Sequence, residues 1–502
     1  MNSIPSIQTL TRYRDKNAHI VGVAGTEGFA ILEFLLKLGF RHITCHNLTG
    51  GTALEQAFLN AHVAMKPQRR ADALRRLLAA PITLFTGPDY LKNVGDADIL
   101  FTTQNWFAHA ANDPLKQARQ SGVPMFFLTQ MYFALSPAPI IGVTGTNGKT
   151  TVTTCLSHLL KTAGIPCLTS GNDRYHPQVL TDLDALPSNG FLLLEISNRQ
   201  LMELGQKPHI AILTNIRPDH IDEHGSFEAY RETKTKLFTA RTEKDWSILN
   251  TEDPSSRIIS QQTQSKCVMY GSSIPATPLS TGFKASQCLF LDENGRSHHL
   301  FDTSDVCLPG HHNLLNSLAA ATAAFIAGAS ASAIQQGIRS FHGVRHRLEY
   351  LGEANEIVYF DDEACTNPEA TRMALESLDR PIILICGGEI KGNRDDYSHL
   401  RQAMTQHRAT HIICLPGDAG QAVAEQAGSV PVHNVPNLEE AMELADRLLR
   451  PGDALVLSPA GAGFHYRFNS GPRGYRRLVR DRIRQAQKNN DKTDTGSINR
   501  DR

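Results

Sequence analysis

The chain has 502 residues, more than one hydrophobic core usually serves, so we expect two to four domains. Its 50 lysines and arginines balance its 50 aspartates and glutamates, so no net charge attracts nucleic acid or anionic lipid. No apolar stretch approaches the roughly 20 residues that span a bilayer, and the N-terminus lacks the apolar core of a signal sequence. These features predict a cytoplasmic protein without nucleic-acid or membrane partners.

Nine cysteines are scattered along the chain without a C-x-x-C pair, and most stand beside apolar residues. Cys386 within IILICGG is an example, because an apolar run of that kind is expected to form a buried strand. The pattern favours buried free thiols in a reducing cytosol over disulfides or a metal site.

Residues 1–138 predict a first α/β domain. The strand-like HIVGVAG leads through a glycine-rich turn into the apolar-periodic FAILEFLLKLGF and a second strand, HITCHN. DADILFTTQ and VPMFFLTQ continue the alternation of strand and helix that is typical of a parallel sheet. The turn with Gly22, Gly25 and Gly28 fits a bound pyrophosphate and a plain tight connection equally well.

A second domain, residues 139–343, opens with PIIGVTGTNGKTT, a strand followed by a glycine-rich turn and a helix from about Lys149. The usual P-loop places its first glycine one position later than Gly142, so a generic match fails by one residue. Gly145 and Gly148 still let the backbone approach a phosphate closely. Lys149 can neutralise phosphate oxygens and the Thr150 hydroxyl can bind magnesium, so we predict a phosphate-binding loop.

Two further segments of this domain carry candidate site residues. FLLLEIS places Glu195 at the end of an apolar strand, which fits a magnesium ligand or an exposed strand end. After the strand HIAILTN come Asp219 and His220, and Lys234 lies a short helix later. The Ala/Leu-rich LPGHHNLLNSLAAATAAFIAG predicts a long helix.

The third domain, residues 344–486, again alternates short apolar strands with helices. The strands EIVYFDDEA, PIILICGG, THIICLPG and DALVLSPAGAG end in Gly, Asp or Pro. The tail, residues 487–502, is polar and is expected to be disordered. The predicted fold class is therefore α/β, in three domains.

Eight motifs in this order make the chain resemble the Mur ligases: GVTGTNGKTT, LLLEISNRQL, LTNIRPDHIDEHGSFEAYRETK, LPGHHNLLNSLAA, GVRHRLEYL, DDEACTNPEATRMAL, CGGEIKG and LSPAGAGF. The off-by-one phosphate loop is that family's own variant. The likeness covers the second and third domains well and the first in layout only. Within the family the motifs are most similar to those of enzymes that add D-glutamate to UDP-N-acetylmuramoyl-L-alanine.

The resemblance implies an ATP-dependent ligase of peptidoglycan precursor synthesis that works through an acyl phosphate and releases ADP and phosphate. It implies a Rossmann-like N-terminal domain for the UDP-substrate, a central ATPase domain and a Rossmann-like C-terminal domain. The expected partners are small molecules, namely ATP, glutamate and a UDP-muramoyl-alanine-like acceptor, and we expect a monomer.

Site residues follow from the resemblance, position by position. Catalytic roles fall to Lys149, His220 and Lys234. ATP would be bound by Gly145, Thr146, Asn147, Gly148, Lys149, Thr150, Thr151, Asn316, Arg347 and Asp362. Two magnesium sites would use Thr150, Glu195, His220 and Lys234, the last matching a lysine that is carbamoylated in the family. The substrates would meet Asn172, Thr366 and Lys391.

The chain departs from the family pattern at several substrate positions. Ala364 stands where the family has a lysine near the reacting phosphate, and Arg345 or Arg394 are candidates to replace that cation. Gly463 stands where a serine meets the glutamate carboxylate. In the first domain, an expected acidic residue is replaced within Cys45-His46-Asn47, and an expected Ser-Pro-Gly is replaced by Thr103-Gln104-Asn105.

These departures leave alternatives open. The enzyme could add a different amino acid, such as L-glutamate, or use a different acceptor; Gly463 and Arg174 motivate this alternative. A non-catalytic, Mur-like ATP-binding partner of wall enzymes is a second alternative, and Ala364 is its best support. Decay would not spare the phosphate loop, Glu195, His220 and Lys234 together, so a divergent ligase is favoured.

Overall fold

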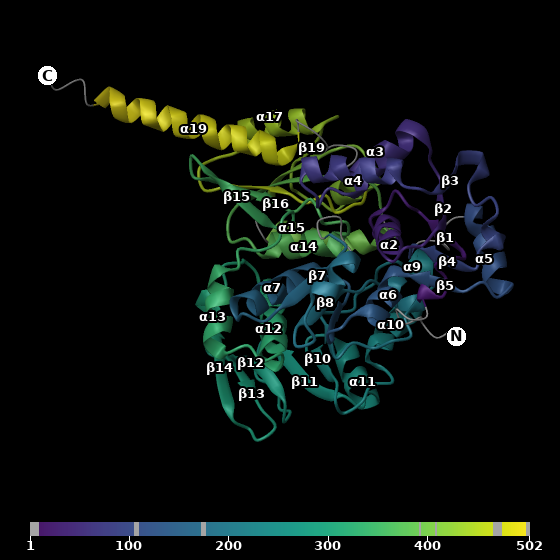
Figure 1. Cartoon of the computed structure of the whole chain (residues 1–502). Coiled ribbons are helices and arrows are strands. Elements are labelled where there is room, and N and C mark those ends of the chain that lie inside the picture. The colour runs from purple at the N-terminus through teal and green to yellow at the C-terminus, as the bar shows by residue number, and fades with distance from the viewer. Residues whose placement is uncertain are drawn as a thin grey trace. The chain divides into compact units, whose positions relative to one another are not determined.

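A computed structural model of the chain describes residues 10–104, 110–171, 177–390, 393–406, 409–464 and 474–497. They fall into two compact units, one within residues 1–216, 231–303 and 317–338, the other within residues 217–230, 304–316 and 339–502. The first unit contains two β-sheets and the second contains one (Figure 1). All three are parallel or mostly parallel and carry helices between their strands, so the predicted α/β class is confirmed.

The first sheet has five parallel strands in the order β3-β2-β1-β4-β5. The strands are β1 (Asn17–Val21), β2 (His42–Asn47), β3 (Thr83–Thr86), β4 (Ile99–Thr102) and β5 (Met125–Phe127). The helices are α2 (Thr26–Lys37), α3 (Gly51–Ala61), α4 (Pro67–Ala79), α5 (Asp113–Gln120) and α6 (Leu128–Leu135), with short 3-10 turns η1 (Gly87–Asp89), η2 (Val94–Asp96) and η4 (Ala110–Asn112). The strand order reverses between β1 and β4, which is where sheets of this kind bind ligands.

The second sheet has nine strands in the order β14-β13-β12-β11-β10-β9-β6-β8-β7. The strands are β6 (Ile140–Thr144), β7 (Cys167–Ser170), β8 (Phe191–Glu195), β9 (Ile210–Leu213), β10 (Trp246–Asn250), β11 (Lys266–Gly271), β12 (Ser280–Lys284), β13 (Gln287–Leu291) and β14 (Ser297–Asp302). All pairings are parallel except those of β12 with β13 and β13 with β14. Strands β12, β13 and β14 were not predicted from the sequence. They are short, and the register of β13 with β14 is irregular.

Helices and 3-10 turns connect the strands of this sheet and lead out of it. They are α7 (Lys149–Thr162), η5 (Leu180–Ala185), α8 (Asn198–Glu203), α9 (Ile221–His224), α10 (Phe227–Thr235), η6 (Lys236–Phe238), α11 (Pro254–Gln262), η7 (Thr303–Asp305), α12 (His311–Ile326) and α13 (Ala331–Ser340). The helix predicted to begin at about Lys149 begins there, and the predicted Ala/Leu-rich helix is α12. Central strands β6, β8 and β9 are almost wholly buried, which explains their continuous apolar runs.

The third sheet has six strands in the order β15-β16-β20-β17-β18-β19, with only β15 antiparallel. The strands are β15 (Glu349–Ala354), β16 (Ile357–Asp361), β17 (Ile382–Cys386), β18 (Ala409–Cys414), β19 (Val432–Asn434) and β20 (Ala454–Leu457). The helices are α14 (Pro368–Glu376), η8 (Arg394–His399), α15 (Leu400–Gln406), α16 (Asp418–Glu425), α17 (Leu438–Leu448) and α19 (Tyr475–Ser497).

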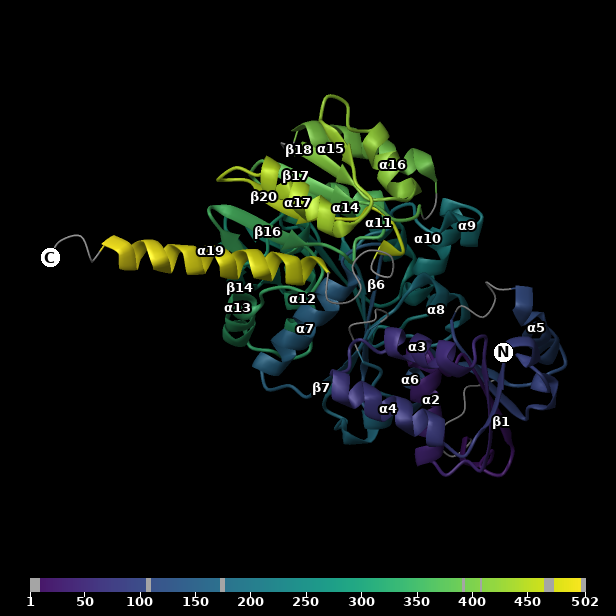
Figure 2. The same cartoon turned by 90° about the horizontal axis from the view of Figure 1, so that it is seen from above.

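Alternate strand residues of the third sheet face two separate cores, as the period of two along a strand requires. Leu384 and Val456 pack with residues of α14, α15 and α16 on one face. Ile385 and Leu455 pack with residues of α17 and the first turns of α19 on the other. Figure 2 shows α14, α15 and α16 grouped beside β17 and β18.

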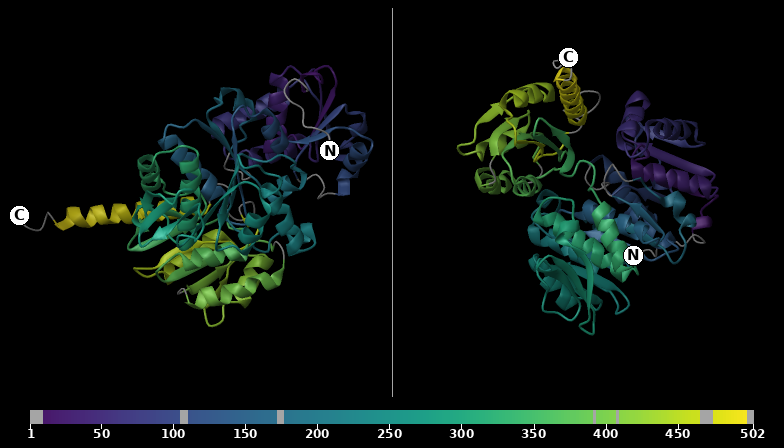
Figure 3. Two further views of the ribbon diagram at one scale, coloured as in Figure 1. Left: turned by 90° about the horizontal axis from the view of Figure 1, so that it is seen from below. Right: turned by 90° about the vertical axis from the view of Figure 1, so that its left-hand side faces the viewer.

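Helix α19 corrects one expectation. The polar composition predicted disorder from residue 487 on, whereas α19 continues to Ser497 and can be followed along its length in the left-hand view of Figure 3. Tyr475 and Val479 anchor its first turns in the core. Extending a helix that is already nucleated costs far less than starting one, so residues of good helix propensity such as Gln and Lys can continue it.

The cysteines of the protein are free thiols, six of them buried, as expected from their apolar neighbours. In the described part of the chain, no helix combines the length and the apolar composition needed to cross a membrane.

Arg241 is a buried cation that ties the beginnings of β9 and β10 together. Its side chain is 2% exposed. Nη1 donates to the carbonyl oxygen of Pro208 at 2.8 Å, and Nη2 donates to those of His209 and Trp246, each at 3.0 Å. The guanidinium thus donates to three carbonyl groups, of which one is buried and two are part-buried.

We expect Arg241→Ala to lower the free energy of unfolding by about 2–4 kcal/mol, because one buried and two part-buried carbonyl groups lose a donor and a large buried side chain is removed. Urea denaturation followed by circular dichroism measures this loss. Arg257→Ala, at an exposed arginine of α11, is the matched control and should change the value by no more than about 0.5 kcal/mol. Equal effects of the two variants would contradict the structural role of Arg241.

Candidate active site

The glycine-rich turn between β6 and α7 can be formed only by glycine at its first position. Gly145 has φ = 151°, and a Cβ there would lie 1.9 Å from Oγ1 of Thr214. Gly148, at the N-cap of α7, has φ = 86°. The backbone therefore lies close to the neighbouring strand end, and the N-terminus of α7 follows directly, an arrangement that suits a phosphate group.

Residues after β9 hold this loop in place. The backbone N–H of Thr146 donates to the Asn215 carbonyl oxygen at 2.8 Å, and that of Asn147 donates to Asn215 Oδ1 at 3.0 Å. Thr214 Oγ1 donates to the Asn147 carbonyl oxygen at 2.6 Å. Thr214 and Asn215 were not predicted from the sequence; their one signal was their position directly after an apolar strand.

Two further hydrogen bonds hold the segment that directly follows β9. Asn250 Nδ2 donates to the carbonyl oxygen of Thr214 at 2.8 Å, and the N–H of Ile216 donates to Asp253 Oδ2 at 2.6 Å. Asn250 and Asp253 are buried, so these bonds are shielded from water. The loop thus rests on a rigid support from two neighbouring strands.

Two lysine side chains meet at one oxygen of the loop. Lys149 Nζ donates to the carbonyl oxygens of Gly145 at 3.0 Å and of Thr146 at 2.7 Å. Lys234 Nζ, on α10, donates to the same Gly145 oxygen at 2.8 Å, and its residue is 1% exposed. The two amines therefore lie within about 6 Å of each other. Two cations this close favour an anion between them.

Glu195 and Thr150 supply oxygen atoms beside this loop. Strand β8 pairs with β6 so that Glu195 lies opposite Val143. Thr144 Oγ1 donates to the carbonyl oxygen of Ile196 at 2.9 Å, which joins the two strand ends. Glu195 is 6% exposed and Thr150 is 4% exposed. A buried carboxylate and a hydroxyl next to a phosphate loop form a donor set that suits magnesium.

A cavity of about 360 Å³ opens at the point where the strand order of the first sheet reverses. It is lined by Val21, Gly22, Ala24, Gly25, Asn47, Leu48, Ala57, Ala61, Tyr90, Thr103 and Asn112. Asn47 belongs to the segment Cys45-His46-Asn47, which replaces the acidic residue expected from the resemblance. Its Oδ1 accepts from the Ala24 N–H at 3.2 Å and its Nδ2 donates to the Thr49 carbonyl oxygen at 3.0 Å. Asn47 therefore stabilises the glycine-rich turn.

Glu27 belongs to a polar ring that joins this cavity to the strand end of Glu195. Its Oε2 accepts from the N–H of Gln104 at 3.2 Å. Gln104 Oε1 accepts from Ser197 Oγ at 2.8 Å, and the Ser197 N–H donates to Gln200 Oε1 at 2.9 Å. Burial raises the pKa of Glu27 to about 7, although hydrogen bonds from Gln104 and Gln200 oppose the shift.

Arg347, Asp362 and Thr366 lie in the second unit. Arg347 Nη1 donates to the carbonyl oxygen of Ala364 at 3.1 Å. Asp362 accepts from the Leu348 N–H at 3.0 Å and from Ser458 Oγ at 2.8 Å, and burial raises its pKa to about 7. Thr366 is half-buried directly before α14.

Asn316 and His220 also lie in the second unit. Asn316 is buried on α12, where its Nδ2 donates to Asn313 Oδ1 at 3.4 Å. His220 has φ = 53° and caps α9, with Nδ1 3.3 Å from Glu223 Oε1 and Nε2 3.8 Å from Asp219 Oδ2. The structure therefore describes the loop, Glu195 and Lys234 in one unit, and Asn316, His220, Arg347, Asp362 and Thr366 in the other.

Three strand ends of the third sheet meet at the segment 458–463. The N–H of Gly387 donates to the Pro459 carbonyl oxygen at 3.1 Å, and Glu389 and Ala462 exchange backbone hydrogen bonds at 2.9 and 2.7 Å. Gly463 has φ = 73°, and no atom lies within 4 Å of the place where its Cβ would be. Its left-handed backbone suits glycine better than the serine of the family. Asn172 and Lys391 lie outside the described residues.

Comparisons with known proteins agree with this arrangement. Residues 143–324 match the family described as Mur ligase middle domain, and residues 346–461 match Mur ligase, glutamate ligase domain. The UDP-N-acetylmuramoylalanine–D-glutamate ligase of Symbiobacterium thermophilum is 30% identical over 91% of this chain and 96% of that protein. The enzyme of the same name from Geobacillus kaustophilus is 35% identical over 70% of this chain and 76% of that protein.

Solved structures with a similar fold are more distant in sequence. UDP-N-acetylmuramate–alanine ligase from Thermotoga maritima superposes with a TM-score of 0.59 at 19% identity, over 94% of this chain and 100% of that one. A pseudomurein peptide ligase type C from Methanothermus fervidus gives a TM-score of 0.56 at 18% identity, over 93% of this chain and 100% of that one. At such identities the likeness shows the fold alone.

Glu27 should make the first unit less stable as the pH rises. Its pKa is about 7 in the folded protein against 4.5 ordinarily, so the folded state binds more protons between these values and loses stability as pH increases through them. We expect Glu27→Gln to raise the free energy of unfolding by about 1–3 kcal/mol at about pH 8 and by much less at about pH 5. Urea titrations of both proteins at the two pH values measure the difference. A gain that does not depend on pH would contradict the buried, proton-binding carboxyl.

Proposed function

Because this chain belongs to the Mur ligase family, we propose that it joins glutamate, with D-glutamate favoured, to a UDP-N-acetylmuramoyl-L-alanine acceptor at the expense of ATP. The name shared by its curated relatives supports the amino acid and the acceptor. The reaction belongs to peptidoglycan precursor synthesis. Free, mostly buried thiols fit a reducing compartment, so we assign the enzyme to the cytoplasm.

One observation carries the proposal: Lys149 and Lys234 both donate to the carbonyl oxygen of Gly145, in a loop that only glycine can form. The ammonium group of Lys149 beside the N-terminus of α7 would give a triphosphate charge neutralisation and orientation, and Lys234 lies close enough for a metal-binding group on its Nζ to act at the same place. Phosphoryl transfer depends mainly on such positioning and charge stabilisation.

We assign the binding of ATP phosphates to residues 145–151 and contacts to the rest of the nucleotide to Asn316, Arg347 and Asp362. Thr150, Glu195 and His220 would hold one magnesium ion, and Lys234, once carbamoylated, would help to hold a second. When bound, these ions neutralise the triphosphate and the charge that develops on the transferring phosphoryl group. Carbamoylation fits Lys234 because it would turn one of two neighbouring cations into an oxygen-bearing anion.

The chemistry requires two steps. A carboxylate oxygen of the acceptor attacks the γ-phosphorus of ATP, the bond to the β-phosphate oxygen breaks, and ADP leaves. The amino nitrogen of glutamate then attacks the acyl carbon, the bond to the phosphate oxygen breaks, and an amide, phosphate and a proton are released. Lys149 and the loop N–H groups hold the phosphates in place throughout.

We place three domains at residues 1–138, 139–343 and 344–486, and we propose that each of them contributes to substrate binding. The cavity at the first sheet suits the uridine end of the acceptor, since it lies at the switch point of a Rossmann-like sheet. Asn172 would meet the acceptor, and Thr366 and Lys391 the glutamate, whose carboxylate Lys391 could pair. We expect the enzyme to act as a monomer.

An amino-acid panel tests the proposed activity. With the muramoyl acceptor and ATP, we expect D-glutamate to accelerate ADP release at least tenfold over any other amino acid, and mass spectrometry to show the acceptor enlarged by one glutamate. A coupled assay of ADP release measures the rate of the reaction with each amino acid. Acceleration by a different amino acid, or ATP binding without turnover for any combination, would remove this proposal.

Lys234 provides a test of the second magnesium site. We expect Lys234→Ala to lower kcat by about 100-fold or more, and acetate or formate to restore part of the loss by supplying a carboxylate. Isotope-labelled bicarbonate should give a carbamate carbon signal by NMR in the parent protein and none in the variant. Lys236→Ala, at an exposed neighbour, should keep both the rate and the signal. A signal that survives Lys234→Ala would contradict the assignment.

A further inference from the structure

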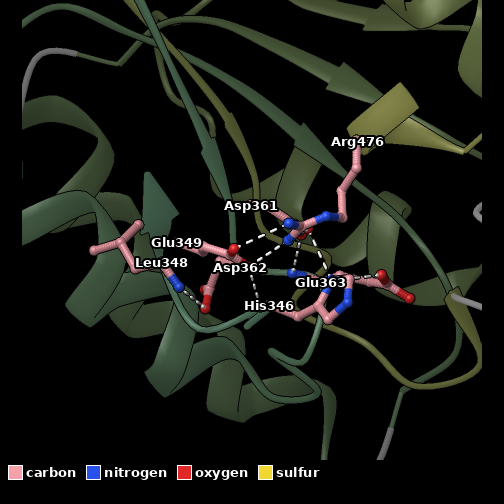
Figure 4. A network of polar contacts seen from close by, with 7 residues as sticks. All are labelled: His346, Leu348, Glu349, Asp361, Asp362, Glu363 and Arg476. Carbon is pink, nitrogen blue, oxygen red and sulfur yellow. Dashed lines mark hydrogen bonds and ion pairs between the residues drawn. The ribbon is translucent and has the colours of Figure 1, made fainter. Parts of the chain in front are cut away.

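Buried carboxylates of the second unit are balanced by cations (Figure 4). His346 Nδ1 lies 2.8 Å from Asp361 Oδ2 and 3.1 Å from Glu363 Oε2, and all three residues are buried. Arg476, at the start of α19, donates through Nη2 to Glu349 Oε1 at 3.0 Å. Burial alone would lower the pKa of His346, but the two carboxylates outweigh it and raise the pKa to about 9, so the ring is an imidazolium at neutral pH. These carboxylates keep their charge because each has a cation beside it.

Glu27, in the first unit, is a buried carboxyl group of the opposite kind, because the groups that hold it are neutral. Its Oε2 accepts from the Gln104 N–H at 3.2 Å, and the side chain of Gln200 is its second hydrogen-bond partner. The residue is 9% exposed and lies in the first turn of α2. Burial disfavours the carboxylate more than these two bonds favour it, so its pKa rises to about 7. Near neutral pH the group is therefore divided between its charged and its neutral form.

The cavity of the first sheet is lined by close neighbours of this carboxyl group, and both belong to the first unit. Gly25 lines the cavity and is the N-cap of α2, two residues before Glu27. Thr103 also lines it, and the next residue, Gln104, holds Glu27. An anion in the cavity would share the positive N-terminal end of α2 with the Glu27 carboxylate. Since like charges disfavour each other, such an anion favours the protonated form of Glu27.

Other titratable side chains stand on the elements around Glu27. They are His62 after α3, Tyr132 on α6, Asp182 on η5, Glu195 at the end of β8, and Arg199 and Glu203 on α8. Burial lowers the pKa of His62 and raises that of Tyr132, so both rings are neutral near pH 7. Glu203 is paired with Arg119 at 2.9 Å. The histidine and the tyrosine therefore stay neutral in the pH range in which Glu27 titrates.

We propose that binding of the acceptor is linked to the uptake of one proton at Glu27, and that the neutral carboxyl group is the form that holds Gln104 beside an occupied cavity. The proton comes from the solvent and stays on a carboxyl oxygen of Glu27 while the ligand is bound. Glu27 is thus a positioning residue for the acceptor. The inference rests on the function proposed above, because it takes the anion in the cavity to be the diphosphate of the acceptor.

Titration calorimetry with UDP-N-acetylmuramoyl-L-alanine, without ATP or glutamate, tests the linkage. The diphosphate and the carboxylate of this ligand keep their charge between about pH 6 and 8. At about pH 7, titrations in two buffers of different ionisation enthalpy should show an uptake of about 0.3–0.5 proton per bound ligand. Raising the pH populates the Glu27 carboxylate, which opposes the anion. The dissociation constant should therefore rise about three- to tenfold from about pH 6 to about pH 8.

Two variants on the same helix separate Glu27 from a general effect of charge. Glu27→Gln keeps the shape of the neutral group, so at about pH 8 it should bind the acceptor within about twofold of the parent at about pH 6, without proton uptake. Glu33→Gln is the matched control, since the Glu33 carboxylate pairs with Arg76 at the surface, and it should keep both the uptake and the pH dependence. In turnover, KM for the acceptor should rise with pH in the parent and stay level in Glu27→Gln, while KM for ATP follows one course in both.

The outcomes distinguish this linkage from the proposed reaction. Acceptor binding without proton uptake, or an uptake that persists in Glu27→Gln, would overturn the linkage and leave the ligase reaction intact. Proton uptake on binding, without turnover for any amino acid, would support the linkage and contradict the reaction. A protein that does not bind the acceptor at all would overturn both. The uptake by the parent protein is measured without any variant, so the test does not depend on the folding of Glu27→Gln.

Discussion

The carbonyl oxygen of Gly145 accepts hydrogen bonds from the ammonium groups of Lys149 and Lys234, and the candidate site of the first unit is arranged around that contact. The loop approaches the neighbouring strand too closely for any side chain at Gly145, and Thr214 and Asn215 fix its backbone groups. Two cations held so close favour a polyanion between them. Glycine at this one position thus permits both the close approach of the backbone and the convergence of the two lysine side chains.

The first sheet is coupled to this centre through buried polar groups. Thr103 lines the cavity, and its neighbour Gln104 contacts both Glu27 and Ser197, two residues beyond Glu195. Gln104, a position at which the chain departs from the family pattern, therefore connects the cavity of the first sheet with the strand end that carries Glu195. A change at the cavity and a change at the strand end can compensate each other when the two places share one hydrogen-bond network.

In the second unit, buried ion pairs hold the turn that carries Arg347. Arg347 lies between two left-handed residues, and the turn is anchored by the imidazolium of His346 and by Arg476 from the last helix. Burying several charges is costly unless they pair and satisfy one another. The pairing here uses residues from three elements, so helix α19 contributes to the candidate site although its outer half is polar.

The sequence by itself determined the α/β class, the glycine-rich turn before α7 and the placement of Glu195 at a strand end, because these depend on local periodicity and on motifs of consecutive residues. Only the tertiary structure showed that Asn215 clamps the loop and that Arg347 lies against Ala364. Those contacts join residues far apart in the chain, and their geometry follows from sheet register and strain, which no local pattern encodes. The same limit explains the polar helix after residue 487, since its stability comes from the buried turns that precede it.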